Sequence, residues 1–553
     1  MRMRSHASRV PACAALEFPM PSTDPTAPES PRPRRAVGWR VATLLGGAVA
    51  IVAIVVVLTT HSKPPALAPR PAVEPVPAGL TAIPEASTDE ANQRAIAYVG
   101  MDACVSCHSA RCAEFQGTRH FQACVEPSPG KMPAEFATGG EYHPGDSSLR
   151  FEMGQKDHEF VVSAVRETPQ GEQRTQSPIA FVYGSGAGTD EVFFTWHGDR
   201  LYELPIVWLH PLNSWGADPF DPHGSGDFSR EWTVRCVECH NTWFEYVPGS
   251  LNEYKRDKFL LGVTCEKCHG PGRLHVEHHA ANPDDKIAHA ITLPRDLPRD
   301  RQMDLCALCH SNSLYHRRPP FSYTPGEKLD DYYRTLQGTQ HPEQDHVANQ
   351  VGYLKQSRCY TESESLTCTS CHNPHRPRPA EHAGVGESAC MRCHQPADCH
   401  EQPRLPTAVQ TNCVGCHMPV GNKIQVYFQT EGDAYVAPVK RWEHRIAVYP
   451  RARDTVMLEW LRTQTDPDSQ KQAAQLTAKL ADDWTQTAES CHDEYRYLAE
   501  IDAWRHVVEL RPTAEAREKL AAAIDAQARI DGDFSEASRF SAQGRYPEAI
   551  KLL

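Results

Sequence analysis

The sequence predicts a loop-rich, mainly α-helical fold with a small β-rich insert, an N-terminal transmembrane helix and a C-terminal all-α helical repeat. Three observations lead to this prediction. The pentapeptide Cys-x-x-Cys-His occurs seven times between Cys104 and His417 of the 553 residues. An uncharged stretch, Val41 to Thr60, precedes that region. After Pro450 cysteines become rare, and apolar residues recur at helical spacing.

The N-terminal segment is predicted to be a membrane anchor. Residues 1–35 are rich in Pro, Ser, Arg and Ala without apolar periodicity, which indicates a disordered tail. The anchor occupies residues 36–60, because the uncharged stretch would span about 30 Å as a helix, the thickness of a bilayer core. Arginines precede it and few cations follow, so the positive-inside rule predicts a single-pass protein of the cytoplasmic membrane. The tail would lie in the cytoplasm, and everything after residue 60 in the periplasm or an equivalent exported compartment. A cleaved signal peptide is the alternative, since Ala66-Leu67-Ala68 resembles a cleavage site.

Residues 61–95 are predicted to form a stalk. Seven prolines lie between His61 and Pro84, and proline favours the extended polyproline II conformation. A plain disordered linker is the alternative.

The repeated pentapeptide indicates the cofactor of residues 96–450. Its two thiols can add across the vinyl groups of a haem, and the adjacent imidazole can bind the iron. Zinc sites and redox disulfides also use paired cysteines, but neither explains a histidine after every second cysteine. The sequence therefore predicts seven covalently attached haem c groups. The thiols that would hold them are Cys104, Cys107, Cys236, Cys239, Cys265, Cys268, Cys306, Cys309, Cys368, Cys371, Cys390, Cys393, Cys413 and Cys416. The iron ligands that follow them are His108, His240, His269, His310, His372, His394 and His417.

The charge of the chain restricts its partners. The formal net charge is −13 at pH 7, which argues against binding to nucleic acid or to anionic lipid. A redox partner protein with a basic docking face suits it better.

Between the first and second motifs the pattern changes to that of strands. Leu149 to Arg166 and Glu191 to Trp208 alternate apolar and polar residues, and His197-Gly198-Asp199 is typical of a hairpin turn. These segments predict the β-rich insert, at about residues 149–210. From residue 236 onward, a short helix is expected to begin or end at each motif.

A second axial ligand for each iron must come from outside its own motif. Seventeen further histidines lie between residues 104 and 444, enough for bis-histidine ligation of seven irons. Local context favours five of them, which are His120, His275, His346, His375 and His444.

Several of these segments together resemble a known family. They are YVGMDACVSCHSARCAEFQGTRH, CEKCHGPGRLH, LTCTSCHNPH, NCVGCHMP and EHRI. They are similar to the multihaem cytochromes of cytochrome c-552/4 type, with a doubled CXXCH motif and frequent fusion to tetratricopeptide repeats. The resemblance covers about Tyr98 to Val448 and implies that His120, His275, His375 and His444 are axial ligands. The chain contains no CxxCK motif, which argues against a nitrite reductase of the related pentahaem type.

Six cysteines remain outside the motifs. Cys13 lies in the predicted tail and Cys491 near the C-terminus. Cys112 with Cys124, and Cys359 with Cys399, are candidate disulfides in an oxidising compartment, and free buried thiols are the alternative.

Residues 451–553 are predicted to be helical. Thr455 to Leu461, Gln470 to Trp484, Tyr495 to Leu510 and Thr513 to Ala528 show amphipathic spacing, with Pro512 between the last two. The pattern resembles tetratricopeptide helix pairs, which would offer a surface to a protein partner. A simple helical bundle packed on the preceding region is the alternative.

Two function classes follow. The favoured one is electron transfer along a chain of haems. The other is an oxidoreductase that acts on a small nitrogen or sulfur compound at one five-coordinate haem. The many spare histidines favour the first, because an open site needs a missing ligand.

Overall fold

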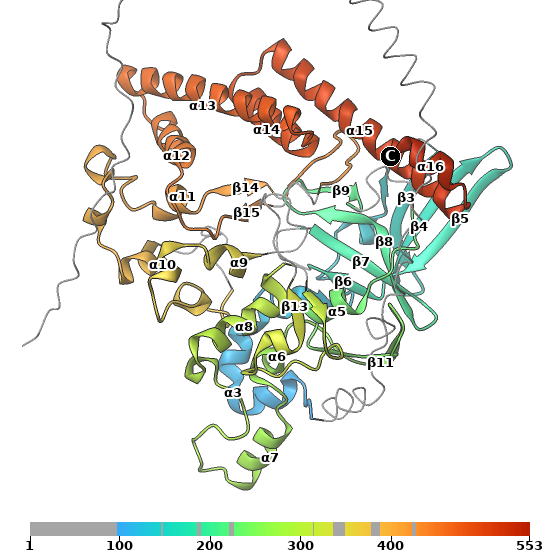
Figure 1. The fold of residues 1–553 in the computed structure, drawn as a ribbon. Coiled ribbons are helices and arrows are strands. Elements are labelled where there is room, and N and C mark those ends of the chain that lie inside the picture. The colour runs from blue at the N-terminus through green and yellow to red at the C-terminus, as the bar shows by residue number, and fades with distance from the viewer. Residues whose placement is uncertain are drawn as a thin grey trace, which may run out of the picture. The chain divides into compact units, whose positions relative to one another are not determined.

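The computed structural model describes most of the chain after residue 96 (Figure 1). The described ranges are 97–144, 148–184, 190–219, 226–312, 314–335, 349–377, 387–422, 427–438 and 440–553. The predicted tail, anchor and stalk lie outside these ranges, and so does His346.

No helix in the described part of the chain is both long enough and apolar enough to cross a membrane. This finding overturns the predicted fold class where it includes a transmembrane helix, and with it the predicted single-pass localisation. The segment on which both predictions were based, Val41 to Thr60, lies outside the described residues.

The prediction of a mainly α-helical fold with a small β-rich insert is also wrong, because strands form a large part of the molecule. One sheet has four strands in sequence order, β2 (Gly140–Tyr142), β3 (Leu149–Lys156), β4 (Glu159–Thr168) and β5 (Gly171–Pro178). A five-stranded sheet has the order β1 (Cys124–Val125), β6 (Phe181–Tyr183), β7 (Asp190–His197), β8 (Arg200–Leu209) and β9 (Ser214–Ala217). Three hairpins are added by β10 (Trp243–Tyr246) with β11 (Tyr254–Leu260), β12 (Leu314–His316) with β13 (Tyr333–Thr335), and β14 (Val420–Asn422) with β15 (Lys440–Trp442).

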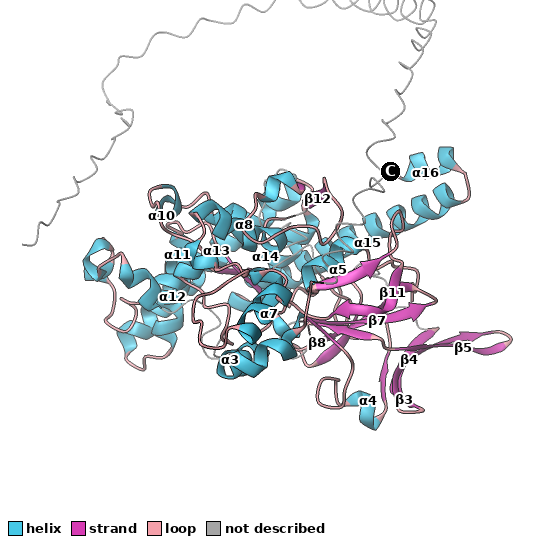
Figure 2. Ribbon diagram, turned by 90° about the horizontal axis from the view of Figure 1, so that it is seen from below, coloured by secondary structure: helices cyan, strands magenta, loops and turns pink. Residues whose placement is uncertain are grey.

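The two larger sheets share a core. Phe151 and Val162 from the four-stranded sheet and Phe193 and Leu204 from the five-stranded sheet are fully buried in one hydrophobic cluster. Alternating apolar residues create this buried face, because successive side chains of a strand point to opposite sides. Figure 2 shows the strands of both sheets gathered apart from most of the helices.

The expected hairpin turn at residues 197–199 is confirmed. His197 pairs with Arg200 across a two-residue loop, and Gly198 has φ +61. A glycine at the first loop position suits the type II′ turn, whose twist matches that of the flanking strands.

Helices or helical turns occur at all seven motifs, including the six from residue 236 onward where the sequence predicts short helices. They are α3 (Met101–Gln116), α5 (Val234–His240), α6 (Cys265–His269), α8 (Arg299–His310) and α11 (Cys413–His417), with 3₁₀ turns η7 (Cys368–Ser370) and η8 (Glu387–Arg392). The connecting helices are α4 (Glu135–Thr138), α7 (Arg273–Ala281), α9 (Gln350–Leu354) and α10 (Arg358–Thr361). Further 3₁₀ turns are η3 (Phe121–Ala123), η4 (Pro294–Asp296), η5 (Leu329–Asp331), η9 (Pro396–Asp398) and η10 (Gln402–Arg404).

The C-terminal region is helical, and each helix packs against the next. The helices are α12 (Pro450–Arg462), α13 (Pro467–Asp493), α14 (Tyr497–Leu510), α15 (Ala514–Ala542) and α16 (Tyr546–Leu552). Asp466 caps α13 by accepting from the Ser469 N–H, and Thr513 caps α15 in the same way at Ala516. With 27 and 29 residues, α13 and α15 each approach the length of a whole 34-residue tetratricopeptide unit, so the helix lengths do not support that repeat.

Candidate haem-binding sites

In a helical turn, cysteines three residues apart lie on the same face, so the two thiols of one motif can reach the same cofactor. Thiols of different motifs also meet. The Cys104 thiol of the first motif lies beside that of Cys265 in the third, and this neighbour lowers the pKa of Cys104. The Cys239 thiol of the second motif meets that of Cys309 of the fourth, whose Sγ also lies 3.7 Å from the Cys239 carbonyl oxygen. The motifs are therefore clustered, although dozens of residues separate them in the sequence.

A third contact of the same kind extends the cluster. The Cys306 thiol of the fourth motif lies beside that of Cys368 in the fifth, and this neighbour raises the pKa of Cys306. The sixth motif is tied to the fifth through Arg392, which donates to the Ser370 carbonyl oxygen at 2.7 Å. The residues that would hold neighbouring haems are therefore close together in space.

Three motif histidines each face a second histidine from a distant segment. The ring centroids of His269 and His375 are 6.0 Å apart with an interplanar angle of 19°. Those of His372 and His444 are 6.2 Å apart at 27°. His310 and His120 form the third pair, at 6.3 Å and 68°. All three distal partners are residues that the sequence proposed as axial ligands.

The spacing of these pairs fits an iron between two imidazoles. With a metal–nitrogen bond of about 2.0 Å, and about 1.1 Å more from the nitrogen to each ring centre, two axial imidazoles have centroids about 6.2 Å apart. Rings in van der Waals contact would lie closer. The three centroid separations, 6.0–6.3 Å, therefore match the value expected for two imidazoles on one iron.

Hydrogen bonds orient one ring of each pair. His269 donates from Nδ1 to the Thr292 carbonyl oxygen at 2.8 Å. Nδ1 of His310 lies 3.1 Å from the side-chain oxygen of Gln350, and Nδ1 of His444 lies 2.9 Å from the Trp442 carbonyl oxygen. Because the acceptor engages Nδ1–H, the Nε2 lone pair remains for a metal, the second-shell arrangement that metal-bound histidines usually show.

The surroundings of His269 and His375 favour the neutral form of both imidazoles. Burial lowers the pKa of His269, and burial followed by the charge of His269 lowers the pKa of His375. Both rings are therefore neutral at pH 7, and neutral imidazole is the form that binds metals.

The remaining predicted ligands are placed as follows. His275 lies in α7 with Nδ1 2.9 Å from the His289 carbonyl oxygen, and Nδ1 of His417 lies 2.8 Å from that of Ala447. His240 packs against the ring of Tyr183, with centroids 4.0 Å apart. The axial roles of His275 and of the motif histidines stay predictions.

Sequence reasoning missed Glu238, which lies between the two cysteines of the second motif and is 1 % exposed. Its carboxylate accepts from Arg235 and His316 at 2.9 Å each, from the Phe321 N–H at 2.6 Å, and from the Tyr333 hydroxyl. Burial would raise its pKa, but the charges of His316, Arg235 and Lys267 outweigh burial and hold it far below its usual value. Glu238 thereby ties α5 to the β12–β13 hairpin that follows the fourth motif.

Glu266, between the cysteines of the third motif, plays a similar part and is 2 % exposed. It accepts from the backbone N–H groups of Val99 at 3.0 Å, Gly100 at 2.9 Å and Gly272 at 2.7 Å. The third motif is thus fixed to the start of α3, which carries the first motif. One feature of the sequence marks both glutamates, because CVECH and CEKCH each carry an acidic residue between their two cysteines.

A glycine holds the segment that carries His120. Gly262 has φ +68, and a Cβ there would lie 2.2 Å from the Phe121 carbonyl oxygen. The next residue, Val263, donates its N–H to the His120 carbonyl oxygen at 2.9 Å. This close approach requires glycine, because any side chain would push the His120 segment away.

The cysteines outside the motifs do not pair with one another in the described residues. Cys112, Cys124, Cys359 and Cys399 are all free thiols. Burial raises the pKa of the Cys124 thiol, with a smaller opposing effect from Asn241. The alternative of free thiols is the one the structure contains.

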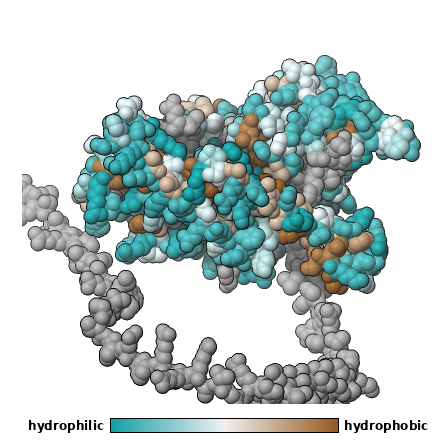
Figure 3. Space-filling view, turned by 90° about the horizontal axis from the view of Figure 1, so that it is seen from above, coloured by the Kyte–Doolittle hydropathy of each residue, from teal (hydrophilic) through white to brown (hydrophobic). Residues whose placement is uncertain are grey.

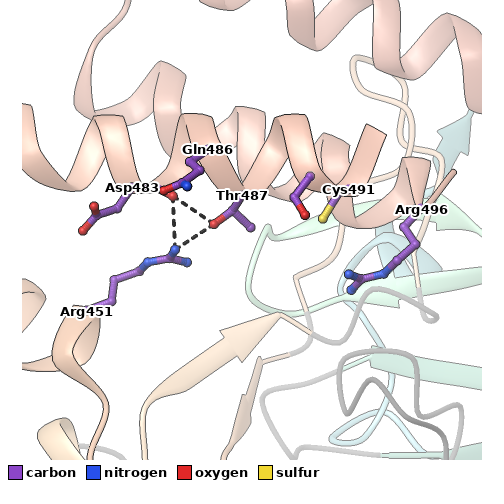
Figure 4. Close-up of a pocket in the computed structure, with 7 residues that line it drawn as sticks. Arg451, Asp483, Gln486, Thr487, Cys491 and Arg496 are labelled. Atoms are coloured by element: carbon purple, nitrogen blue, oxygen red, sulfur yellow. Dashed lines mark hydrogen bonds between the residues drawn. The ribbon is translucent and has the colours of Figure 1, made fainter. Parts of the chain in front are cut away.

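A separate cavity of about 320 Å³ lies in the C-terminal helical region (Figure 4). Arg451 reaches across it from α12 and donates to the Asp483 carbonyl oxygen at 3.1 Å and the Thr487 hydroxyl at 2.7 Å. Cys491 and Arg496 line its other end. These contacts join α12 to α13 and involve none of the motif residues.

Comparisons with known proteins agree with the haem chemistry. The family model for cytochrome c554 and c-prime matches residues 224–270, which contain the second and third motifs. The multiheme cytochrome MtrA of Shewanella baltica (strain OS185) is 23% identical over 208 residues, 35% of this chain and 54% of that protein. The chain therefore matches about half the length of this curated relative.

Among solved structures, the outer cell wall cytochrome OcwA aligns over 78% of this chain and 99% of its own, at 15% identity and a TM-score of 0.41. A likeness this loose supports no argument about the fold. The repeated motifs and the two sequence matches support a multihaem c-type cytochrome, a protein of electron transfer.

Proposed function

We propose that this chain relays electrons along a row of seven covalently attached c-type haems, one at each Cys-x-x-Cys-His motif. The observation that carries the proposal is the set of three imidazole pairs, each with ring centroids 6.0–6.3 Å apart. Two strong axial ligands on an iron favour electron transfer over substrate binding, because no coordination position is left open.

The contacts between motifs support a path through the molecule. The proximity of Cys104 to Cys265 supports a path in which a haem at the first motif would neighbour one at the third. The proximity of Cys239 to Cys309, and of Cys306 to Cys368, supports continuation of that path through the second, fourth and fifth motifs. A contact between distant segments supports the same path. His375 follows the fifth motif in the sequence, but its ring is paired with that of His269 in the third motif.

The partner in this proposal is a redox protein with a basic docking face. The net charge of −13, to which haem propionates would add, supports electrostatic steering of a cationic partner. Figure 3 shows a largely hydrophilic face with small scattered apolar areas, which suits transient encounter better than permanent association.

The test is a haem count followed by spin-state measurement on the purified holoprotein. A pyridine haemochrome assay should give seven haems per chain. Electron paramagnetic resonance of the oxidised protein should show low-spin ferric iron, without a high-spin signal that azide perturbs. His375→Ala should convert about one seventh of the iron to high spin by removing one axial ligand. His158→Asn, in the exposed turn between β3 and β4, serves as the control and should change nothing.

Two results would contradict the proposal. A count well below seven would show that some motifs carry no haem. An azide-sensitive high-spin signal in the unmodified protein would favour the oxidoreductase alternative, with catalysis at an open haem.

A further inference from the structure

Three side chains outside the haem motifs converge near the C-terminal end of α7. The Oδ2 atom of Asp285 lies 3.0 Å from Nε2 of His278 and 3.0 Å from Nε2 of His289. The three potential ligand atoms all lie within 4.8 Å of one another, and the two imidazole centroids are 4.1 Å apart. Helix α7 supplies His278, and the loop after it supplies the other two (Figure 1).

We propose that His278, Asp285 and His289 form a binding site for one divalent transition-metal ion of the zinc class. Two imidazoles and one carboxylate are ligands that zinc and its neighbours prefer. With bonds of about 2.1 Å, adjacent ligand atoms lie about 3.0 Å apart in an octahedral site and about 3.4 Å apart in a tetrahedral one. The two separations from Oδ2, each 3.0 Å, therefore match the distance between adjacent ligand atoms of an octahedral site.

The carboxylate is held in place before any metal binds. Its other oxygen, Oδ1, accepts from the Ile287 N–H at 2.9 Å, which directs Oδ2 between the two rings. All three side chains are partly exposed, which leaves room for water molecules to complete the coordination.

The alternative is a hydrogen-bonded cluster in which both Nε2–H groups donate to the carboxylate. The two states differ in one respect, because a metal needs the Nε2 lone pairs where the cluster needs Nε2–H. A measurement of metal content and ligand type therefore separates them.

The site lies close to a predicted haem ligand. The carbonyl oxygen of His289 is 2.9 Å from Nδ1 of His275, one turn before His278 in the same helix. A bound ion would fix the backbone of the loop and with it the acceptor that orients the His275 ring. This link rests on the proposed function, whereas metal binding itself does not.

The experiment uses the holoprotein, because covalent haem survives treatment with a chelator. After EDTA treatment and dialysis, Zn²⁺ is titrated by calorimetry, and retained zinc is counted by plasma mass spectrometry. One equivalent should bind to the unmodified protein, and Asp285→Asn should weaken that binding at least tenfold. Asp284→Asn, the exposed neighbouring carboxylate, is the matched control and should bind as the unmodified protein does.

X-ray absorption at the zinc edge identifies the ligands without any variant. Two imidazole nitrogens and one carboxylate oxygen at about 2.0–2.1 Å are expected. The proposal is overturned if the unmodified protein retains no zinc, if Asp285→Asn binds zinc as tightly as Asp284→Asn, or if the absorption spectrum shows thiolate ligands. Soret and circular dichroism spectra check that each variant folds. The absorption result decides alone if Asp285→Asn does not fold.

Discussion

Replacing Glu266 by glutamine should loosen the junction between the third motif and the start of α3. The carboxylate is buried and accepts three backbone N–H groups, two at Oε1 from Val99 and Gly272 and one at Oε2 from Gly100. Glutamine keeps one oxygen for the first two donors. Its amide NH₂ would then face the Gly100 N–H, donor against donor.

The magnitude follows from these contacts. Glu266→Gln loses one charge-assisted hydrogen bond and leaves one buried N–H unsatisfied, at a cost of about 2–3 kcal/mol. Glu266→Ala leaves all three N–H donors without an acceptor in the protein. It should lower the free energy of unfolding by about 3–6 kcal/mol, and by less where water molecules accept from these donors instead. A local loss of about 2 kcal/mol corresponds to an increase in opening of about 30-fold.

The assay is amide hydrogen exchange, because it reports local opening of one segment. The amides of Val99, Gly100 and Gly272 should exchange about 30-fold faster or more in Glu266→Gln, with a lower melting temperature by circular dichroism. Glu277→Gln, an exposed glutamate of α7, is the control and should leave exchange unchanged. Unchanged protection of all three amides in both Glu266 variants would refute the reasoning, because it would mean that other acceptors hold α3.

Three further predictions concern ligation, backbone geometry and acid stability. His444→Ala should convert one haem from low to high spin, measured by magnetic circular dichroism, and retention of every low-spin iron would show that His444 is no ligand. Gly262→Ala should lower the melting stability by at least about 2 kcal/mol, because its Cβ meets a backbone carbonyl. Gly249→Ala, also at positive φ (+80) but in open space, should cost about 1 kcal/mol, and equal losses would contradict the clash. Burial would raise the pKa of Asp454, but hydrogen bonds, first from its neighbouring arginine and then from Lys479, hold it below the usual value. Ionised Asp454 therefore contributes about 1 kcal/mol to the free energy of unfolding after screening. This contribution is complete above the usual pKa of an aspartate and is lost as the pH falls through the lowered pKa of Asp454. Asp454→Asn should flatten the melting temperature against pH in that acid range, and an unchanged acid slope would count against it.

The parts of the fold with a strong local pattern could be predicted from the sequence. The turn at Gly198 and the helix break at Pro512 both follow from backbone preferences of single residues. The extent of the sheets could not be predicted in the same way. Strand β5 is polar and exposed along most of its length, so no alternation marks it. It forms because its backbone completes the hydrogen bonds of β4.

For the candidate sites, too, local sequence motifs could be read from the sequence, whereas contacts made in the tertiary structure could not. The motifs named the thiols and the first imidazoles, and the resemblance named His120, His375 and His444. The identity of each pair depended on tertiary structure, because His310 and His120 are distant in sequence. Glu266 was missed for the same reason, since its partners Val99 and Gly100 are more than 160 residues away.

The contacts between cysteines of different motifs have a consequence for when haem is attached relative to folding. In the folded chain, the Cys104 thiol lies beside that of Cys265, and the Cys306 thiol lies beside that of Cys368. A chain that folded before receiving its cofactors would present these thiols to one another, and under oxidising conditions thiol–disulfide exchange could join them across motifs. Each such crosslink would remove one thiol from each of two attachment sites. We therefore expect haem attachment to come before the final packing, while the motifs are still far apart.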